Sequence, residues 1–444
     1  MPTRYHVAVR RPDDPAILVL ADGAMPGFTM DAAPEWEVVT PVVTQLRVEH
    51  GLDVVALRAA WIGPAGRDGR TDRLYDTVLA SGTLPSGSRW VDPDALERRP
   101  TALGRAIEDG ALRPALGDRQ PWYQVAWFQE IGAWIHDRLH DAGVRPRGPV
   151  RQVRSWGRAA LLTVETDRGR LWVKQVPSVF SHEVAVTGLL ADIDPGIVPP
   201  LMAAEPALGR LMMEDVSGPI LASTPDATDA WVATITRLAE IQRVLSADLD
   251  ALAVAGVPRA SLPDLADRIP TLLADQALML TGEDGGLTPR ECDALVTAAG
   301  DLAATCRALA GSAIGPSLEH GDLSAAQVIV GEMGPVLLDW SDATIAHPFL
   351  AAASFLAADD HVPTTLADRL RDAYVDAWAP SVGRADASRA MTLARIVQPL
   401  HMAQLHADRI LPGLEQRWEL EREVPRLLRS LLPHLPSLPR MLGS

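Results

Sequence analysis

The chain of 444 residues contains no asparagine, and only one of its 41 basic residues is a lysine, Lys174. A bias toward GC-rich codons accounts for both shortages, because it replaces these amino acids wherever the chemistry tolerates a substitute. Without asparagine, the chain has no acceptor for N-glycosylation and no asparagine side chain that could bind a metal ion. A lysine that survives such a bias predicts a position that needs a compact ammonium group, for which the planar guanidinium of arginine does not substitute.

Cysteines, metal-binding motifs and long apolar runs are also scarce. Cys292 and Cys306 are too few for a disulfide framework, and the absence of HExxH and CxxC spacings argues against a zinc site. The longest uncharged run in the C-terminal half, residues 343–358, is shorter than a membrane span. The first residues lack the apolar segment of a signal peptide, so we expect a cytoplasmic protein without a membrane partner.

The composition is otherwise that of a globular protein with an acidic surface. Hydrophobic residues make up 47% of the chain and charged residues 22%, which is enough for a large core. The 57 acidic against 41 basic residues give a net charge of −16, which argues against general binding of nucleic acid. The length predicts two or three domains.

The N-terminal third divides into three predicted regions. Residues 1–97 predict an α/β domain with one helix at 40–50, which Gly51 closes. Residues 98–120 are polar and predict a linker, and residues 121–149 predict an amphipathic connecting helix whose tryptophans we assign to core packing. The strands of the first domain are predicted at 5–9, 17–20, 54–60 and 74–79.

The rest of the chain predicts a small sheet-rich lobe followed by a large helical lobe. Residues 150–216 form the first lobe, and residues 217–444 form the second, which a short β-hairpin at 327–338 interrupts. The strands of the first lobe are predicted at 151–155, 159–166, 171–176 and 209–214, and its helix at 181–190.

The hairpin region carries the strongest chemical signal, in the run LEHGDLSAAQVIVGEMGPVLLDWSDA. Phosphoryl transfer from a nucleotide needs a carboxylate that orients the substrate hydroxyl, and Asp322 is placed for that role. The transfer also needs oxygen ligands for Mg²⁺, and these are Gln327 and Asp339, five and 17 residues further along the chain. The spacing therefore predicts a phosphotransferase site.

Lys174 lies in the run Leu-Trp-Val-Lys-Gln-Val, in the middle of a predicted strand. A buried ammonium group destabilises a fold unless a carboxylate or a phosphate pairs with it. Glu183, on the next predicted helix, is a suitable carboxylate, and the phosphates of a nucleotide would be the other partner. The only lysine of the chain therefore falls where a kinase requires one.

These segments resemble the aminoglycoside phosphotransferase group of small-molecule kinases, which are relatives of protein kinases and choline kinases. The run HGDL at 320–323 is similar to the group's HGDLH catalytic loop, and the run LDW at 338–340 is similar to its metal motif. The resemblance covers residues 150–444 and implies an α+β, bilobal protein-kinase-like fold. It also implies Mg²⁺ as a cofactor and ATP or GTP as the co-substrate.

The same resemblance implies a role for each site residue. Asp322 would be the catalytic carboxylate with His320 as its structural neighbour, and Gln327 and Asp339 would bind Mg²⁺. Lys174 would contact the α- and β-phosphates. The other nucleotide-binding residues would come from the adjoining helix, the phosphate-covering loop and the hinge that receives the adenine: Glu183, Gly157, Met213, Glu214, Asp215 and Val216.

Three positions depart from the pattern of the group. Gln327 stands where the group has asparagine, and it offers the same amide oxygen on a stem one methylene longer, as in the actinobacterial maltokinases, which share this feature. The phosphate-covering loop at 155–158 has one glycine, and Ser324 replaces the usual histidine. In addition, Asp342, three residues after Asp339, either takes a second metal ion or caps the following helix.

The N-terminal region weakly resembles a Nudix domain whose metal-binding box is degenerate. Glu49 and Gly51 remain of that box, whereas Gln45 and Val48 occupy positions where it needs carboxylates. One carboxylate does not assemble the metal site that hydrolysis of a nucleoside diphosphate bond requires. We therefore expect a non-hydrolytic binding or packing module.

Two functional hypotheses follow. The first is a nucleotide- and Mg-dependent O-phosphotransferase that acts on a hydroxyl of a small molecule, such as an antibiotic, a sugar, an amino alcohol or a pathway intermediate. The alternative is a nucleotide-binding pseudokinase that acts as a scaffold or regulator, which Gln327 and the glycine-poor loop favour. The joint presence of Lys174, Asp322 and Asp339 favours the enzyme. The sequence predicts no oligomeric state.

Overall fold

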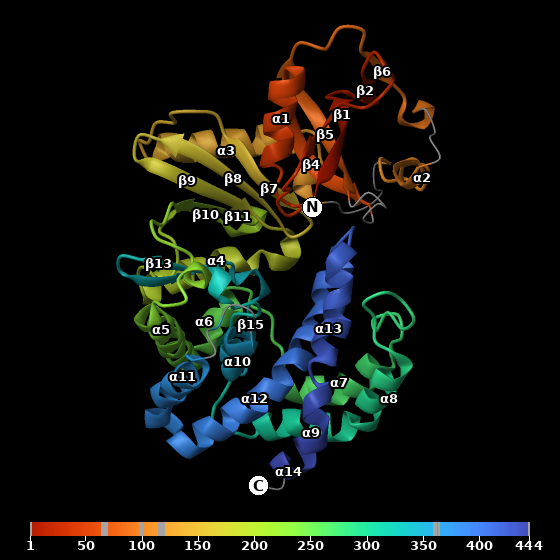
Figure 1. The fold of residues 1–444 in the computed structure, drawn as a ribbon. Coiled ribbons are helices and arrows are strands. Elements are labelled where there is room, and N and C mark those ends of the chain that lie inside the picture. Colours follow the sequence, from red (N-terminus) through yellow and green to blue (C-terminus); the bar gives the residue numbers. More distant parts are fainter. Residues whose placement is uncertain are drawn as a thin grey trace. The chain divides into compact units, whose positions relative to one another are not determined.

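The computed structural model describes residues 2–63, 70–96, 101–113, 120–357, 362 and 365–442. The chain forms two compact units, Met1–Pro177 and Ser178–Ser444, and both contain strands and helices (Figure 1). Within the described part, no helix is long and apolar enough to cross a membrane. The finer division predicted from the sequence, with boundaries near 97, 120, 149 and 216, remains a prediction.

The first unit begins with a mixed sheet in the order β4-β5-β1-β2-β6, with β3 paired to β1. Strands β1 and β5 are parallel, and the other neighbours are antiparallel. The Nudix resemblance of this region remains a prediction. The strands are β1 (Thr3–Arg11), β2 (Asp14–Val19), β3 (Gly27–Met30), β4 (Leu52–Ile62), β5 (Thr71–Gly82) and β6 (Arg89–Val91).

Helix α1 (Thr40–His50) lies between β3 and β4 in the chain, with the bounds that the sequence predicts. Pro41 lies in its first turn, where the missing N–H leaves no hydrogen bond unmade. Gly51 ends the helix with a φ of 68°, and its N–H donates to the carbonyl of Arg47. A left-handed residue at this position favours glycine, which explains why the end of the helix is readable from the sequence.

Three antiparallel strands follow in the first unit, β7 (Arg151–Trp156), β8 (Ala159–Thr166) and β9 (Gly169–Gln175). Helix α3 (Trp127–Asp141) lies beside these strands, and its tryptophans Trp127 and Trp134 are buried (Figure 1). The indole nitrogen of Trp127 donates to the side-chain oxygen of Gln175 at 2.8 Å. The prediction that this aromatic stripe packs in the core is therefore confirmed.

Strand β7 also covers the outer edge of the first sheet. The side-chain amide of Gln152 accepts from the backbone N–H of Ala56 at 2.8 Å and donates to the carbonyl of the same residue at 2.9 Å. The hydroxyl of Ser155 donates to the carbonyl of Leu57 at 2.6 Å. Because β4 is an edge strand, its outer backbone groups could otherwise pair with a strand of another molecule. The side chains of Gln152 and Ser155 satisfy these groups instead.

Replacement of Gln152 by leucine should destabilise the first unit. The variant leaves the N–H and C=O of Ala56 facing an apolar side chain, so we expect a loss of about 2–5 kcal/mol in the free energy of unfolding. Urea unfolding followed by circular dichroism measures this loss, and the exposed Gln124, replaced by leucine, is the matched control. A Gln152→Leu protein as stable as this control would show that the contact between β7 and β4 contributes nothing.

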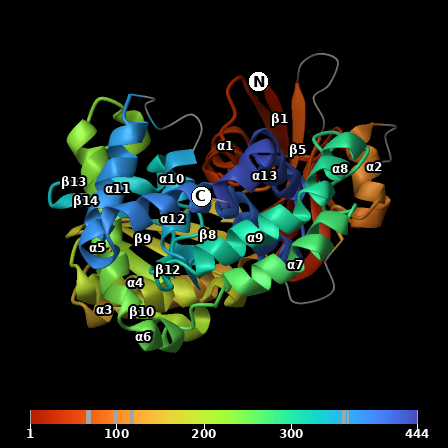
Figure 2. The same cartoon turned by 90° about the horizontal axis from the view of Figure 1, so that it is seen from below.

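The second unit opens with helix α4 (His182–Ile193) and the antiparallel pair β10 (Leu201–Glu205) and β11 (Arg210–Glu214). Helices dominate the remainder, and α7 and α9 run side by side (Figure 2). These helices are α5 (Thr228–Ser246), α6 (Leu249–Val254), α7 (Leu262–Ala274), α8 (Pro289–Thr297), α9 (Ala299–Ala310), α10 (Phe349–Ala357), α11 (Ala367–Val382), α12 (Arg384–Leu405), α13 (Glu423–Arg429) and α14 (Leu438–Leu442).

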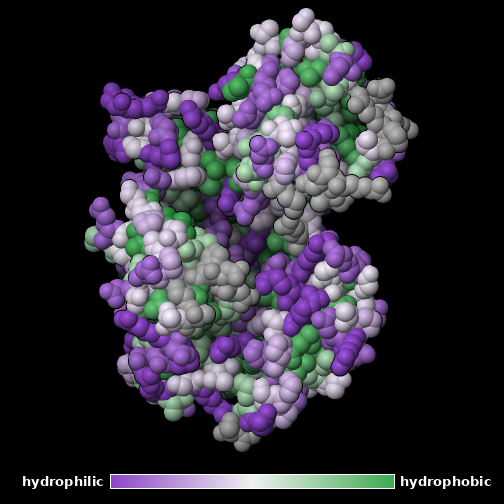
Figure 3. Space-filling model, in the orientation of Figure 1, coloured by the Kyte–Doolittle hydropathy of each residue, from purple (hydrophilic) through white to green (hydrophobic). Residues whose placement is uncertain are grey.

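Hydrophilic side chains cover most of the visible face of each unit, and apolar side chains appear there in small separate patches (Figure 3). The large apolar residues with the greatest exposure, Val48, Val254 and Met333, come from separate elements. The apolar half of the composition is therefore mostly buried, as expected for a globular protein.

Candidate active site

Two short antiparallel strand pairs in the second unit hold the segment that carries the predicted catalytic residues. Strand β12 (Ser317–Glu319) pairs with β15 (Thr344–Ala346), and β13 (Val328–Gly331) pairs with β14 (Gly334–Leu337). The predicted hairpin is therefore present, and the loop between β12 and β13 contains Asp322.

His320 connects this loop to the end of β14. Its Nε2 lies 3.0 Å from the carbonyl oxygen of Leu338, and its Nδ1 accepts from the backbone N–H of Asp322 at 3.4 Å. Burial lowers the pKa of His320, which favours the neutral ring, and because Nδ1 accepts from Asp322, Nε2 carries the proton that faces Leu338. The ring also packs on Trp340, with centroids 4.4 Å apart. The side chain of His320 therefore holds the backbone at Leu338, the residue before Asp339, and at Asp322.

Glu319 holds the same loop from the other side. One carboxylate oxygen accepts from the backbone N–H of Gly321 at 2.9 Å, and the other accepts from the hydroxyl of Thr344 at 3.2 Å. His401, on α12, lies 3.3 Å from that second oxygen. Glu319 and His401 are almost completely buried, and a buried carboxylate needs such partners to remain charged. The catalytic loop is thus tied to β15 and to α12.

Gly321 allows the loop to pass close to Asp342. Its φ is 87°, and a Cβ atom at this position would lie 2.4 Å from the carbonyl oxygen of Asp342 and 2.5 Å from its Cβ. Both the left-handed backbone and the lack of space therefore require glycine. Asp322 follows this turn and is exposed, as a group that meets a substrate must be.

A Gly321→Ala variant should be destabilised by about 2–5 kcal/mol, because it combines backbone strain with a steric clash against backbone atoms. Thermal and urea unfolding measure the change. Gly188→Ala is the control, since Gly188 lies inside α4 with nothing within 4 Å of its Cβ position, and there alanine should stabilise the helix slightly. Equal stability of Gly321→Ala and the original protein would contradict the tight turn described here.

Gln327 and Asp339 stand at the two sides of the hairpin. The backbone N–H of Leu338 donates to the carbonyl of Gln327 at 2.8 Å, so one predicted metal ligand is bonded to the residue that precedes the other. Both side chains are half-buried. Asp339 has a left-handed backbone, with a φ of 62°, and its Oδ1 accepts from the hydroxyl of Ser341 at 2.8 Å. Strained non-glycine residues of this kind concentrate at functional sites.

This donor set fits Mg²⁺. One carboxylate and one amide oxygen supply hard oxygen ligands, and Mg²⁺ commonly takes only one or two protein ligands and completes its shell with water and phosphate. Within the described residues no group of three or more His, Cys, Asp or Glu side chains could hold a metal ion by itself. Gln327 and Asp339 would therefore hold Mg²⁺ together with a nucleotide.

The structure excludes one of the two roles that the sequence left open for Asp342. It ends a 3₁₀ turn and precedes strand β15, so the expectation that it caps a following helix is wrong. Strand β15 follows Asp342 in place of the expected helix, and the next helix, α10, begins only at Phe349. Asp342 is buried and acts electrostatically on the neighbouring His182 and Arg409. Its role as a second metal ligand remains a prediction.

The predicted adenine hinge lies beside the same hairpin. Met213 and Glu214 end β11, and Asp215 and Val216 follow it in an extended, partly exposed segment. Further along, the carbonyl of Pro219 accepts from the backbone N–H of Val330 on β13 at 2.9 Å. The second unit therefore places the predicted hinge near the hairpin that carries the two metal-ligand candidates.

The remaining predicted nucleotide-binding residues lie on other elements. Lys174 is half-buried one residue before the end of β9, opposite Leu161 of β8, and Gly157 lies in the two-residue turn between β7 and β8. Glu183 is buried in the first turn of α4. Lys174 belongs to the first unit and Glu183 to the second, and their pairing remains a prediction.

The sequence did not reveal the residues that hold the catalytic loop. Glu319 and Thr344 are opposite each other on β12 and β15, and each strand is only three residues long, too short for an alternating pattern. His401 is 82 residues from Glu319 and lies among apolar residues of α12. Ser341 donates to Asp339 and lies two residues after it. Of these supporting residues, Ser341 could have been found from the sequence, because a hydroxyl at this distance commonly bonds a carboxylate.

No protein-family model and no curated protein matches the chain. Solved structures do match it. The Plasmodium vivax ethanolamine kinase aligns over 77% of this chain and 97% of its own length, with 12% identity and a TM-score of 0.50. A choline/ethanolamine kinase family protein from Mesorhizobium loti aligns over 71% and 98%, with 13% identity and a TM-score of 0.49. The GDP and kanamycin complex of the aminoglycoside phosphotransferase APH(2″)-IIIa aligns over 69% and 98%, with 18% identity and a TM-score of 0.48.

At these identities the likeness concerns the fold, and the ethanolamine kinase match carries it. The sequence-based expectation of a sheet-bearing lobe followed by a helical part agrees with that match. The chain therefore has the fold of the small-molecule kinases that its catalytic-loop and metal motifs resemble.

Proposed function

We propose that the protein is a nucleotide- and Mg-dependent phosphotransferase that phosphorylates a hydroxyl group of a small molecule. The observation that carries this proposal is the double contact of His320, which joins the backbone at Asp322 to the residue before Asp339. The proposed catalytic carboxylate and the proposed metal ligand are thereby attached to backbone segments that one side chain holds together. Phosphoryl transfer relies mainly on such positioning and on charge neutralisation.

In the proposed reaction, the hydroxyl oxygen of the acceptor forms a bond to the γ-phosphorus of the nucleotide. The bond between that phosphorus and the β,γ-bridging oxygen breaks, and the nucleoside diphosphate leaves. Asp322 orients the hydroxyl and accepts its proton. Its exposure supports this role, because the carboxylate must meet a group that arrives from solvent.

The other residues bind the nucleotide. The backbone of residues 213–216 receives the base, and Lys174 contacts the α- and β-phosphates with Glu183 as its carboxylate partner. Mg²⁺ bound by Gln327 and Asp339 would neutralise the charge of the phosphates. The half-buried setting of Lys174 on β9 supports its role, because an ammonium group there gains from a phosphate partner.

An assay of γ-³²P transfer tests the proposal. The protein is incubated with labelled ATP or GTP, with Mg²⁺ or with EDTA, and with a panel of aminoglycosides, sugars and amino alcohols. We expect label in at least one acceptor, and only with Mg²⁺. Binding of nucleotide without transfer to any member of a broad panel would favour the alternative of a nucleotide-binding scaffold.

A further inference from the structure

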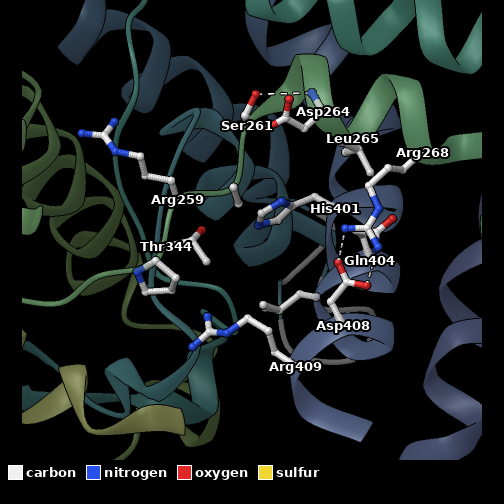
Figure 4. A pocket seen from close by; sticks show the side chains of 13 residues that line it. Arg259, Ser261, Asp264, Leu265, Arg268, Thr344, His401, Gln404, Asp408 and Arg409 are labelled. Atoms are coloured by element: carbon white, nitrogen blue, oxygen red, sulfur yellow. Dashed lines mark hydrogen bonds and ion pairs between the residues drawn. The ribbon is translucent and has the colours of Figure 1, made fainter. Parts of the chain in front are cut away.

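A cavity of about 160 Å³ lies in the second unit, between residues 258–268, Thr344 and residues 401–409 (Figure 4). Thr344 and His401 form part of its wall. Both contact Glu319, whose other carboxylate oxygen accepts from the backbone N–H of Gly321. The wall of the cavity and the catalytic loop therefore share one buried carboxylate.

Two buried polar atoms at this cavity lack a hydrogen-bond partner among the described residues. They are Nη1 of Arg409, a donor, and Oε1 of Gln404, an acceptor, and both residues line the cavity. The other terminal nitrogen of Arg409 donates to the carbonyl of Val179 at 2.9 Å, which fixes the guanidinium group. A buried polar group without a partner is destabilising, so a ligand that satisfies both atoms would gain a hydrogen bond to each of them.

The segment that presents Arg409 is unusual. Helix α12 passes at its end into a π-helical turn, His406–Ile410, and such turns occur frequently at functional sites. In Figure 4 the side chain of Arg409 points toward Thr344. Gln404 and Arg409 come from the two sides of the junction between the α-helix and the π-turn, so the turn supplies the donor and the helix the acceptor.

The charges around the cavity compensate one another. Arg268 and Asp408 form a two-contact ion pair, with both N···O distances at 2.7 Å. The charge of Arg409 acts on the carboxylate of Asp342. Arg259 and Asp264, also on the rim, are exposed and of opposite sign. The cavity therefore offers no excess of negative charge for a cationic amine and little excess of positive charge for a phosphate.

The lining also lacks the groups that recognise quaternary ammonium ions. Among the described residues around the cavity there is no phenylalanine, tyrosine or tryptophan that could form an aromatic cage. One unsatisfied donor and one unsatisfied acceptor in a charge-balanced cavity suit a ligand whose groups both donate and accept, and hydroxyl groups do so. The volume is below the roughly 300–1,000 Å³ of pockets for drug-sized ligands, so it suits a small molecule or one unit of a larger one.

We propose that this cavity binds the acceptor, and that the acceptor is an uncharged polyhydroxylated molecule, such as a sugar or another polyol, rather than a cationic amine. Arg409 Nη1 donates to one of its hydroxyl oxygens, and Gln404 Oε1 accepts from one of its hydroxyl protons. The assignment of the cavity to the acceptor rests on the proposed phosphotransferase function, whereas the match to a polyol rests on the cavity itself.

A binding experiment without nucleotide tests the match to a polyol. Glucose, myo-inositol and glycerol are compared with choline, kanamycin and inorganic phosphate by saturation-transfer NMR and calorimetry. Gln404→Met keeps the length of the side chain and removes the acceptor, so we expect about tenfold weaker binding of the polyol. The same change removes a buried unsatisfied oxygen, so thermal stability should stay equal or rise. Gln276→Met, at an exposed position of the same unit, should change neither quantity.

Two results would overturn the inference: tighter binding of choline, kanamycin or phosphate than of any polyol, or polyol binding that Gln404→Met leaves unchanged. The transfer assay separates this outcome from failure of the proposed function. Phosphate transfer to choline that is insensitive to Gln404→Met would leave the kinase standing and refute the polyol cavity. Polyol binding that depends on Gln404, without transfer to any acceptor, would support the cavity's ligand and refute the phosphotransferase.

Discussion

Replacement of Asp322 by asparagine should lower kcat for phosphate transfer by about 10²- to 10⁴-fold, the usual contribution of a positioned acid–base group. Asparagine preserves the size of the side chain but does not accept the proton of the acceptor hydroxyl. Asp322 is exposed, and the contact of its backbone N–H with His320 is unaffected, so the loop should keep its conformation. The KM for nucleotide should therefore change little.

Steady-state kinetics and calorimetric titration with ATP measure these two quantities. The matched control is Asp301→Asn, because this aspartate lies in the first turn of α9, away from the catalytic loop. A fall in kcat with intact nucleotide binding supports Asp322 as the group that accepts the proton. Full activity of the Asp322→Asn protein would remove Asp322 from the mechanism.

The second large effect is expected at Asp339. Asp339→Asn removes the negative charge from the stronger of the two proposed Mg²⁺ ligands, and we expect at least about a 100-fold rise in the Mg²⁺ concentration needed for half-maximal activity. The hydrogen bond from Ser341 can still be accepted by the amide oxygen, so the turn should survive the change. Activity measured against Mg²⁺ concentration gives the effect.

Gln327→Asn provides a contrasting variant at the opposite side of the hairpin. It restores the residue that the resembled kinases have, with the same amide oxygen on a shorter stem, and should shift the Mg²⁺ dependence by much less than Asp339→Asn. A Gln327→Asn protein with an unchanged Mg²⁺ profile would remove Gln327 from the metal site. An unchanged profile in Asp339→Asn would do the same for Asp339.

The sequence predicted the elements that have a local cause. Helix α1 was predicted with its bounds because Pro41 and Gly51 mark its two ends. Strand β8 was also predicted with its bounds, since its apolar positions are continuous between two turns. The hairpin was also predicted, and the candidate site residues around it lie within a short stretch of chain, where their order and spacing are fixed.

The contacts that stabilise the site were hidden for physical reasons. Strands β12 and β15 are three residues each and pair across 25 positions of chain, so neither shows a period. In the sequence nothing distinguishes Glu319 from an ordinary acidic residue, because its partner His401 lies near it only in the folded protein. The contact of Gln152 with Ala56 spans 96 residues, and nothing in the local sequence distinguishes that glutamine from a surface one. Long-range polar contacts of this kind require the three-dimensional fold.

The meaning of the scarce residues also became clearer. Lys174 is half-buried and lies one residue before the end of β9 rather than in the middle of a strand, because the strand begins and ends earlier than the sequence predicts, and its role at a nucleotide remains a prediction. Gln327, the substitute for an absent asparagine, is held by a backbone hydrogen bond to Leu338, the residue before Asp339. The hairpin therefore fixes the backbone from which the glutamine side chain, one methylene longer than that of asparagine, extends. This fixed position supports the proposed role of Gln327 as an oxygen ligand.

The most direct test of the central claim is ³¹P NMR of the reaction products with ATP, Mg²⁺ and a polyol acceptor. The proposed phosphotransferase predicts that the γ-phosphate signal disappears and that a phosphate monoester appears in a one-to-one ratio with ADP. Release of inorganic phosphate alone would show a hydrolase, and unchanged ATP with every acceptor in the panel would show a nucleotide-binding scaffold. Either result would contradict the function proposed for this protein.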